Sequence, residues 1–122
     1  MFENNNPAVV KSANLAIKVV RLYKYLTEQK KEFVMSKQVL RCGTSVGANI
    51  KESLYAQSEA DFLTKINIAL KEASETEYWL ELLNKTKYID KEQFDYVNAE
   101  CSEIIRILIK TVRTIKNKTK QI

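Results

Sequence analysis

The chain has 122 residues and a formal net charge of +5; 45% of its residues are hydrophobic, 29% are charged and none is histidine. This length is typical of one domain, so the sequence predicts a single domain over residues 1–122. The lack of histidine excludes imidazole bases and histidine metal ligands, and no apolar run approaches the ~20 residues of a membrane span.

The first predicted helix covers residues 7–30. Asn6 is a suitable N-cap, and Pro7 fits the first turn, where its missing N–H is not needed. Two apolar seams follow, each at alternating steps of three and four: Val9, Ala13, Ala16, Val20 and Tyr23, and Leu15, Val19, Leu22 and Leu26. This is more apolar surface than one packing partner requires, so we expect additional neighbours.

The second predicted helix covers residues 36–56, with Ser36 as its cap. Gly43 and Gly47 are the only glycines, and they lie four residues apart on its apolar line. Each costs about 1 kcal/mol against alanine inside a helix. We expect close packing of a neighbouring helix against both. A phosphate-binding loop is the alternative, but no strand precedes Gly43 and no lysine follows Gly47.

The third predicted helix, residues 59–85, is central because little of its surface is purely polar. Ser58 and Asp61 resemble a capping box. Its main seam has a period of 3.5 residues and consists of Phe62, Ile66, Ala69, Ala73, Thr76, Leu80 and Leu83. We interpret the neighbouring Tyr78 and Trp79 as packing or interface groups, with a base-stacking platform as the alternative.

Glu72 and Glu75 lie among apolar residues of the same helix, and a buried carboxylate needs a cation or hydrogen-bond donors. The sequence therefore predicts a buried polar network formed by Arg41, Asn49, Glu72 and Glu75. The alternative is a carboxylate metal site. The Glu-x-x-His motifs of di-iron bundles are absent, so we expect neither metal nor cofactor.

The fourth predicted helix covers residues 91–116, with Asp90 as cap and Gln93 in the box position, and a frayed tail at 117–122. Four amphipathic segments joined by short connections predict an all-α fold, an antiparallel up-down four-helix bundle.

Charge is unevenly distributed. Residues 104–122 contain six Lys or Arg and no Asp or Glu. Two basic lines, one on the first helix and one on the fourth, could lie side by side if these helices are neighbours: Lys11, Lys18, Arg21 and Lys24, and Arg106, Lys110, Arg113 and Lys116. A solvated basic face is the simpler interpretation, and binding to a nucleic-acid backbone is the functional one.

Cys42 and Cys101 lie in separate predicted helices, so we expect free thiols. The N-terminal residues show no basic-then-apolar order, which predicts no signal peptide. Together these features favour the cytoplasm.

Two stretches resemble a known family. RCGTSVGANI at residues 41–50 and the segment from Asp61 to Leu83 are similar to small bacterial proteins encoded within intervening sequences of 23S ribosomal RNA genes. The resemblance implies a four-helix protomer that assembles as a homopentamer. It also implies a fold like that of the accessory variability protein of diversity-generating retroelements, a basic pentamer that binds nucleic acid and a reverse transcriptase.

These observations lead to one functional prediction and one alternative. We expect a non-enzymatic, oligomeric helical scaffold that binds RNA or DNA backbone through the two basic lines. The alternative is an adaptor whose partner is another protein and whose basic surfaces have no nucleic-acid role.

Overall fold

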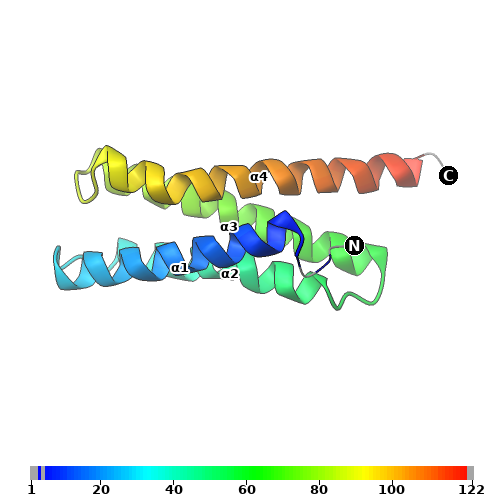
Figure 1. The fold of residues 1–122 in the computed structure, drawn as a ribbon, viewed down its shortest axis with the longest axis horizontal. Helices are drawn as coiled ribbons and strands as arrows, with labels where there is room; N and C mark the ends of the chain where they lie inside the picture. Colours follow the sequence, from blue (N-terminus) through cyan, green and yellow to red (C-terminus); the bar gives the residue numbers. More distant parts are fainter. Residues whose placement is uncertain (1–2, 4, 121–122) are drawn as a thin grey trace.

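The computed structural model describes residue 3 and residues 5–120, with side chains as far as residue 118. It contains four helices, α1 (Pro7–Glu28), α2 (Met35–Ser53), α3 (Glu59–Lys85) and α4 (Lys91–Lys120), and no strand in the described residues. Successive helices run in opposite directions (Figure 1). Each helix packs on its neighbour in sequence, and α4 closes the ring against α1. The predicted antiparallel four-helix bundle is therefore confirmed.

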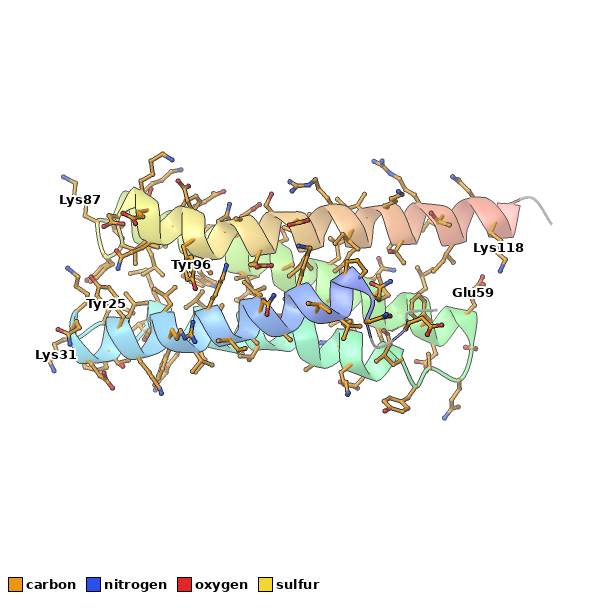
Figure 2. All side chains as sticks on the ribbon, viewed as in Figure 1. Tyr25, Lys31, Glu59, Lys87, Tyr96 and Lys118 are labelled. Carbon is orange, nitrogen blue, oxygen red and sulfur yellow. The ribbon has the colours of Figure 1, made fainter. Side chains whose placement is uncertain are left out.

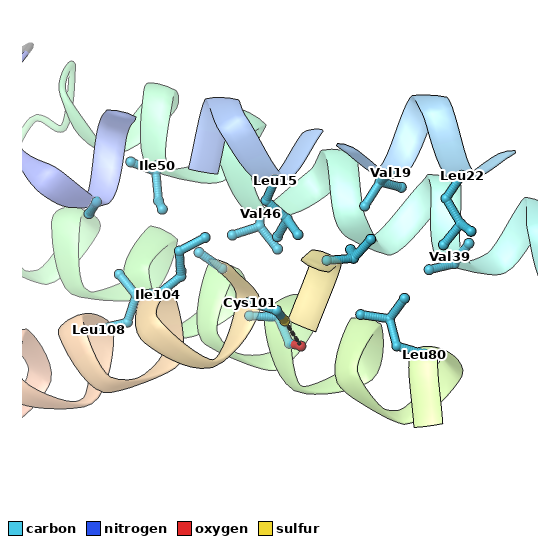
Figure 3. Close-up of a cluster of buried hydrophobic side chains, with 14 of the residues drawn as sticks. Leu15, Val19, Leu22, Val39, Val46, Ile50, Leu80, Cys101, Ile104 and Leu108 are labelled. Carbon is cyan, nitrogen blue, oxygen red and sulfur yellow. Dashed lines mark hydrogen bonds between the residues drawn. The ribbon is translucent and has the colours of Figure 1, made fainter. Parts of the chain in front are cut away.

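The core is built from one seam of each helix, as the heptad spacing predicts. On α1 the buried positions are Ala8, Ser12, Leu15, Val19, Leu22 and Leu26. On α3 they are the seven residues of the predicted main seam, from Phe62 to Leu83. Figure 3 shows Leu15 of α1 beside Val46 of α2 in the interior, with Ile104 of α4 on the opposite side of the core. Burial of these side chains supplies the main driving force for folding.

Three of the predicted helix caps are present. Asn6 Oδ1 accepts a hydrogen bond from the Ala8 N–H at 2.8 Å, and Ser58 Oγ accepts one from the Asp61 N–H at 3.0 Å. Asp90 and Gln93 form a complete capping box, each side chain accepting from the other's backbone N–H. These caps fix where α1, α3 and α4 begin.

The predicted cap of α2 is wrong. Ser36 lies inside the first turn and is fully buried, and its hydroxyl donates to the Glu32 carbonyl at 2.8 Å. The Glu32 carboxylate does the capping instead, because it accepts from the N–H groups of Val34, Met35 and Ser36 at 3.1, 3.0 and 2.7 Å. A negative charge at this position also interacts favourably with the positive N-terminal end of the helix dipole.

Three predicted helix ends differ from the structure. α1 ends at Glu28 because Lys31 has a φ of 55° and the Glu32 N–H bonds back to the Leu26 carbonyl. After Ser53, residues 54–56 continue in tighter turns with i→i−3 hydrogen bonds.

α4 continues to Lys120, so 117–120 are helical where a frayed tail is predicted, and 121–122 lie outside the described residues. No Gly or Pro interrupts that segment.

None of the described helices is long and apolar enough to cross a membrane.

Candidate nucleic-acid interface

The basic line of α1 is partly neutralised by α4. Lys11 Nζ lies 3.0 Å from Glu103 Oε2, and Lys18 Nζ lies 3.5 Å from Glu100 Oε1. Lys18 also donates to the Tyr96 carbonyl at 3.0 Å. Arg21 and Lys24 are exposed and form no ion pair within the described residues. The two helices are neighbours, but the predicted joint basic surface is interrupted where these acids lie.

The basic line of α4 has different surroundings. Its members, Arg106, Lys110, Arg113 and Lys116, are all exposed, and we call them the cationic α4 face. Arg106 Nη1 donates to Ser102 Oγ at 3.0 Å, and none of the four forms an ion pair within the described part of the chain. Ten residues of helix place these four charges along about 15 Å.

The length of α4 explains this difference. α4 has 30 residues and α1 has 22, and the C-terminal end of α4 extends beyond the start of α1 (Figure 1). The acids of α4 all lie at or before residue 103, and the last two of them, Glu100 and Glu103, pair with α1. Near the C-terminal end, Lys118 Nζ lies 3.8 Å from Glu59 Oε2 of α3. The cationic α4 face is thus a compact region of uncompensated positive charge.

Glu100 and Glu103 are the interface residues that sequence reasoning missed. Their three-residue spacing places them on one side of a helix, which was a usable signal. Pairing them with Lys18 and Lys11 also requires the register of α4 against α1, and the sequence pattern alone does not supply that register.

Gly43 and Gly47 lie where α1 approaches α2. A Cβ added to Gly43 would lie 2.7 Å from Val19 Cγ2, and one added to Gly47 would lie 3.4 Å from the Ser12 carbonyl oxygen. Gly43 therefore allows a close approach of α1, whereas Gly47 makes an ordinary contact, so the predicted close packing holds at Gly43 alone; the continuous helix leaves no room for a phosphate loop. The contact at Gly43 is much the tighter of the two.

The predicted polar network is only partly right. Arg41 pairs with Glu72 at 3.3 Å and also with Glu75, which accepts from Trp79 Nε1 at 3.0 Å. Asn49 takes no part, because its amide donates to Ser45 of its own helix. The cluster is not buried: the Arg41, Glu72 and Glu75 side chains are 52%, 21% and 37% exposed. These three side chains therefore lie at the surface between α2 and α3 rather than in the core.

Part of the apolar surface of α1 lies outside the core. Val10, Ile17 and Val20 are 48%, 51% and 38% exposed, and we call them the outer α1 face. Beside them, a groove of about 290 Å³ between α1 and α2 is lined mainly by small side chains, among them Ala13, Ala16 and Ala48. A single bundle therefore leaves an apolar surface in contact with water.

The described residues near these surfaces contain no cluster of metal ligands. In the described residues, no group of three or more His, Cys, Asp or Glu side chains could hold a metal ion. Cys42 and Cys101 are buried free thiols. Burial, with the charge of Glu77, raises the pKa of Cys101 from 9.0 to about 12, so this thiol stays protonated near neutral pH.

Comparison with known proteins identifies the family. A sequence profile described as 23S rRNA-intervening sequence protein matches residues 4–110. The chain belongs to this family. The resemblance carried by residues 41–50 and 61–83 is thereby confirmed, and the family profile includes α1 to α3 and α4 as far as Lys110.

A solved structure supports the same membership in this intervening-sequence family. It is a Bacteroides thetaiotaomicron protein of unknown function from the S23 ribosomal protein family. The two chains are 56% identical with a TM-score of 0.85, over 86% of this chain and 97% of that one. No curated protein matches. Arg113 and Lys116 lie beyond the family match, so half of the cationic α4 face is outside it.

Proposed function

We propose that this intervening-sequence family protein is a non-enzymatic, oligomeric scaffold that binds the phosphate backbone of RNA or DNA. The observation that carries the proposal is the cationic α4 face, four exposed charges with no acidic partner within the described residues. Binding to phosphates needs clustered cations and releases condensed counterions, without a catalytic group or a base-reading motif. The cytoplasm is the compartment we propose, because both cysteines are free thiols.

The proposed oligomer consists of copies of this chain. Covering the outer α1 face with a second copy would remove apolar surface from water, which favours association. The family resemblance supplies the number five. A homopentamer would carry +25, five times the charge of one chain, and would present five cationic α4 faces to one nucleic acid.

Titration of the protein against labelled duplex and single-stranded oligonucleotides over a salt series tests the proposal. We expect binding at ~50 mM salt that weakens steeply as salt rises, because each neutralised phosphate releases counterions. Absence of binding at low salt, or binding without a salt slope, would refute the proposal. The adaptor alternative would then be supported if the immobilised protein captures a partner protein from a nuclease-treated lysate.

A triple variant locates the binding surface. Lys110, Arg113 and Lys116 are changed to Gln, and Arg106 is kept because it donates to Ser102. We expect the slope of log affinity against log salt to flatten by about two to three, close to one unit per lost phosphate contact.

The matched control removes the same charge elsewhere. Lys37, Lys71 and Lys85 are exposed and form no ion pair in the described part of the molecule. Their triple change to Gln should leave the slope near that of the wild type. An equal flattening in both variants would show that net charge, rather than the cationic α4 face, drives binding.

A further inference from the structure

A groove between α1 and α4 lies away from the cationic α4 face, at the end of the bundle that holds the α3–α4 turn. One cavity of about 200 Å³ is lined by Lys18, Arg21, Tyr25, Gln93 and Tyr96, among others. A second, of about 330 Å³, shares Tyr25 and Gln93 and continues to Lys30, Lys87 and Tyr88. Because the two cavities share Tyr25 and Gln93, they lie next to each other, and we call them together the tyrosine groove.

Aromatic rings from facing helices line this groove. Tyr25 comes from α1 and Tyr96 from α4, and Figure 2 shows both at the side where these helices meet. The Lys18 ammonium lies 4.1 Å from the centre of the Tyr96 ring, yet Tyr96 remains 53% exposed. A cation therefore lies over the ring, while about half of the Tyr96 surface remains accessible.

The charges around the rings favour an anion. Arg21, Lys30 and Lys87 line the groove and form no ion pair in the residues that the structure describes. Asp90 is the acid that lines it, and its carboxylate is already an acceptor for the Gln93 N–H at the start of α4. Lys30 Nζ also lies 6.0 Å from the Tyr25 ring centre, so cations and rings alternate along the groove.

We propose that the tyrosine groove binds an unpaired nucleotide segment, with a base stacked on Tyr96 and flanking phosphates on Arg21, Lys30 and Lys87. Alternating rings and cations match the base–phosphate repeat of a single strand. In a duplex the bases are stacked on each other, so a duplex would offer this groove its phosphates alone. This inference rests on the proposed nucleic-acid function, but it uses different residues and adds a preference for single strands.

The test compares an oligothymidylate with an abasic oligomer of the same length and charge. The wild type should bind the base-containing strand more tightly, by about fivefold or more, which is the lower range measured for one stacked base. Tyr96→Leu should remove this difference and leave binding of the abasic strand unchanged. Tyr96→Phe, which keeps the ring, should bind like the wild type.

Tyr78→Leu is the matched control, because Tyr78 is 56% exposed on α3 and lies outside the groove. It should bind both strands like the wild type. Equal binding of the two strands by the wild type, an equal loss in Tyr96→Leu and Tyr78→Leu, or a poly-glutamate that competes as well as the oligonucleotide would overturn the inference.

The outcomes also separate this inference from the function on which it rests. If the wild type binds both strands equally and with a salt slope, the tyrosine groove is refuted while backbone binding stands. If the wild type binds neither strand at low salt, both are refuted. The triple Gln variant of Lys110, Arg113 and Lys116 should weaken both strands alike, whereas Arg21→Gln should weaken the single strands more than a duplex.

Discussion

Gly43 lies at the closest approach of α1 to α2, and the side chain that faces it cannot move easily. Val19 is fully buried and branched at Cβ, so its rotamer is restricted. Gly47 faces the backbone of Ser12 instead, at the 3.4 Å of an ordinary contact. Two glycines that look equivalent in the sequence therefore have different tolerance for a methyl group.

We expect Gly43→Ala to lower stability and Gly47→Ala to leave it unchanged or raise it. At Gly43, overpacking against Val19 costs about 1–3 kcal/mol, which exceeds the gain of about 1 kcal/mol in helix propensity. At Gly47 the propensity gain meets little opposition. Urea denaturation of both variants measures the difference, and a shift of the same sign in both would contradict the packing account.

Cys101 makes stability depend on pH in the alkaline range. Its pKa in the folded protein is about 12, against 9.0 ordinarily, so the unfolded chain loses this proton first as pH rises. The stabilisation is complete below pH 9 and is lost as the pH rises from 9 towards 12.

We therefore expect wild-type stability to fall by about 1–2 kcal/mol more than that of Cys101→Ser between pH 8.5 and 10.5. Serine does not titrate there, and its hydroxyl can keep the donor role that Cys101 Sγ has toward the Ala73 carbonyl at 3.1 Å. Other titrating groups affect both proteins equally. Parallel stability curves would refute the prediction.

At the scale of elements, heptad spacing was sufficient to predict the four helices and their buried seams. Asn6, Ser58 and Asp90 were readable because each precedes its helix directly. The cap of α2 was not, since Glu32 lies two residues before the N-cap position and reaches forward along the chain. A loop conformation, with Lys31 at positive φ, brings Glu32 into place, and local propensity does not specify such a loop.

The candidate interface was less predictable than the helices. The exposure of the cationic α4 face follows from helical spacing. Its lack of ion pairs among the described residues follows from the absence of Asp and Glu in residues 104–122. The neutralisation of Lys11 and Lys18 depends on the register between α1 and α4, which is set by packing over the whole bundle. Asn49 was misplaced for a different reason: its amide donates to Ser45, four residues earlier on the same helix, instead of reaching across to α3.

The ion pairs between α1 and α4 provide a prediction about this register. Changing Glu100 and Glu103 to Gln should free Lys18 and Lys11, tighten nucleic-acid binding and steepen its salt slope. Partly exposed pairs contribute at most about 1 kcal/mol each, so the bundle should remain folded. Fluorescence anisotropy over a salt series measures the effect.

The control for this pair is the double change of Glu28 and Glu81 to Gln. Both are exposed, and neither forms an ion pair among the described residues. If this control gains as much affinity as the Glu100 and Glu103 variant, the freed lysines have no specific role.

At the scale of the whole molecule, the outer α1 face is the surface that one bundle leaves uncovered. Ile17 lies at its centre and is 51% exposed, so Ile17→Lys should cost the protomer little stability but should dissociate an oligomer. Tyr55→Lys is the control, because Tyr55 is also a large exposed side chain, at 74%, and lies after α2 rather than on α1. It should leave the assembly intact.

The mass of the purified wild-type protein in solution, by sedimentation or light scattering, tests the central claim most directly. If copies cover the outer α1 face for one another, the mass should be about 70 kDa, five times the 14.1 kDa of one chain, and Ile17→Lys should reduce it. A wild-type mass of 14.1 kDa at ~10 µM protomer would contradict the claim, because the apolar face would then be exposed to water in the stable protein.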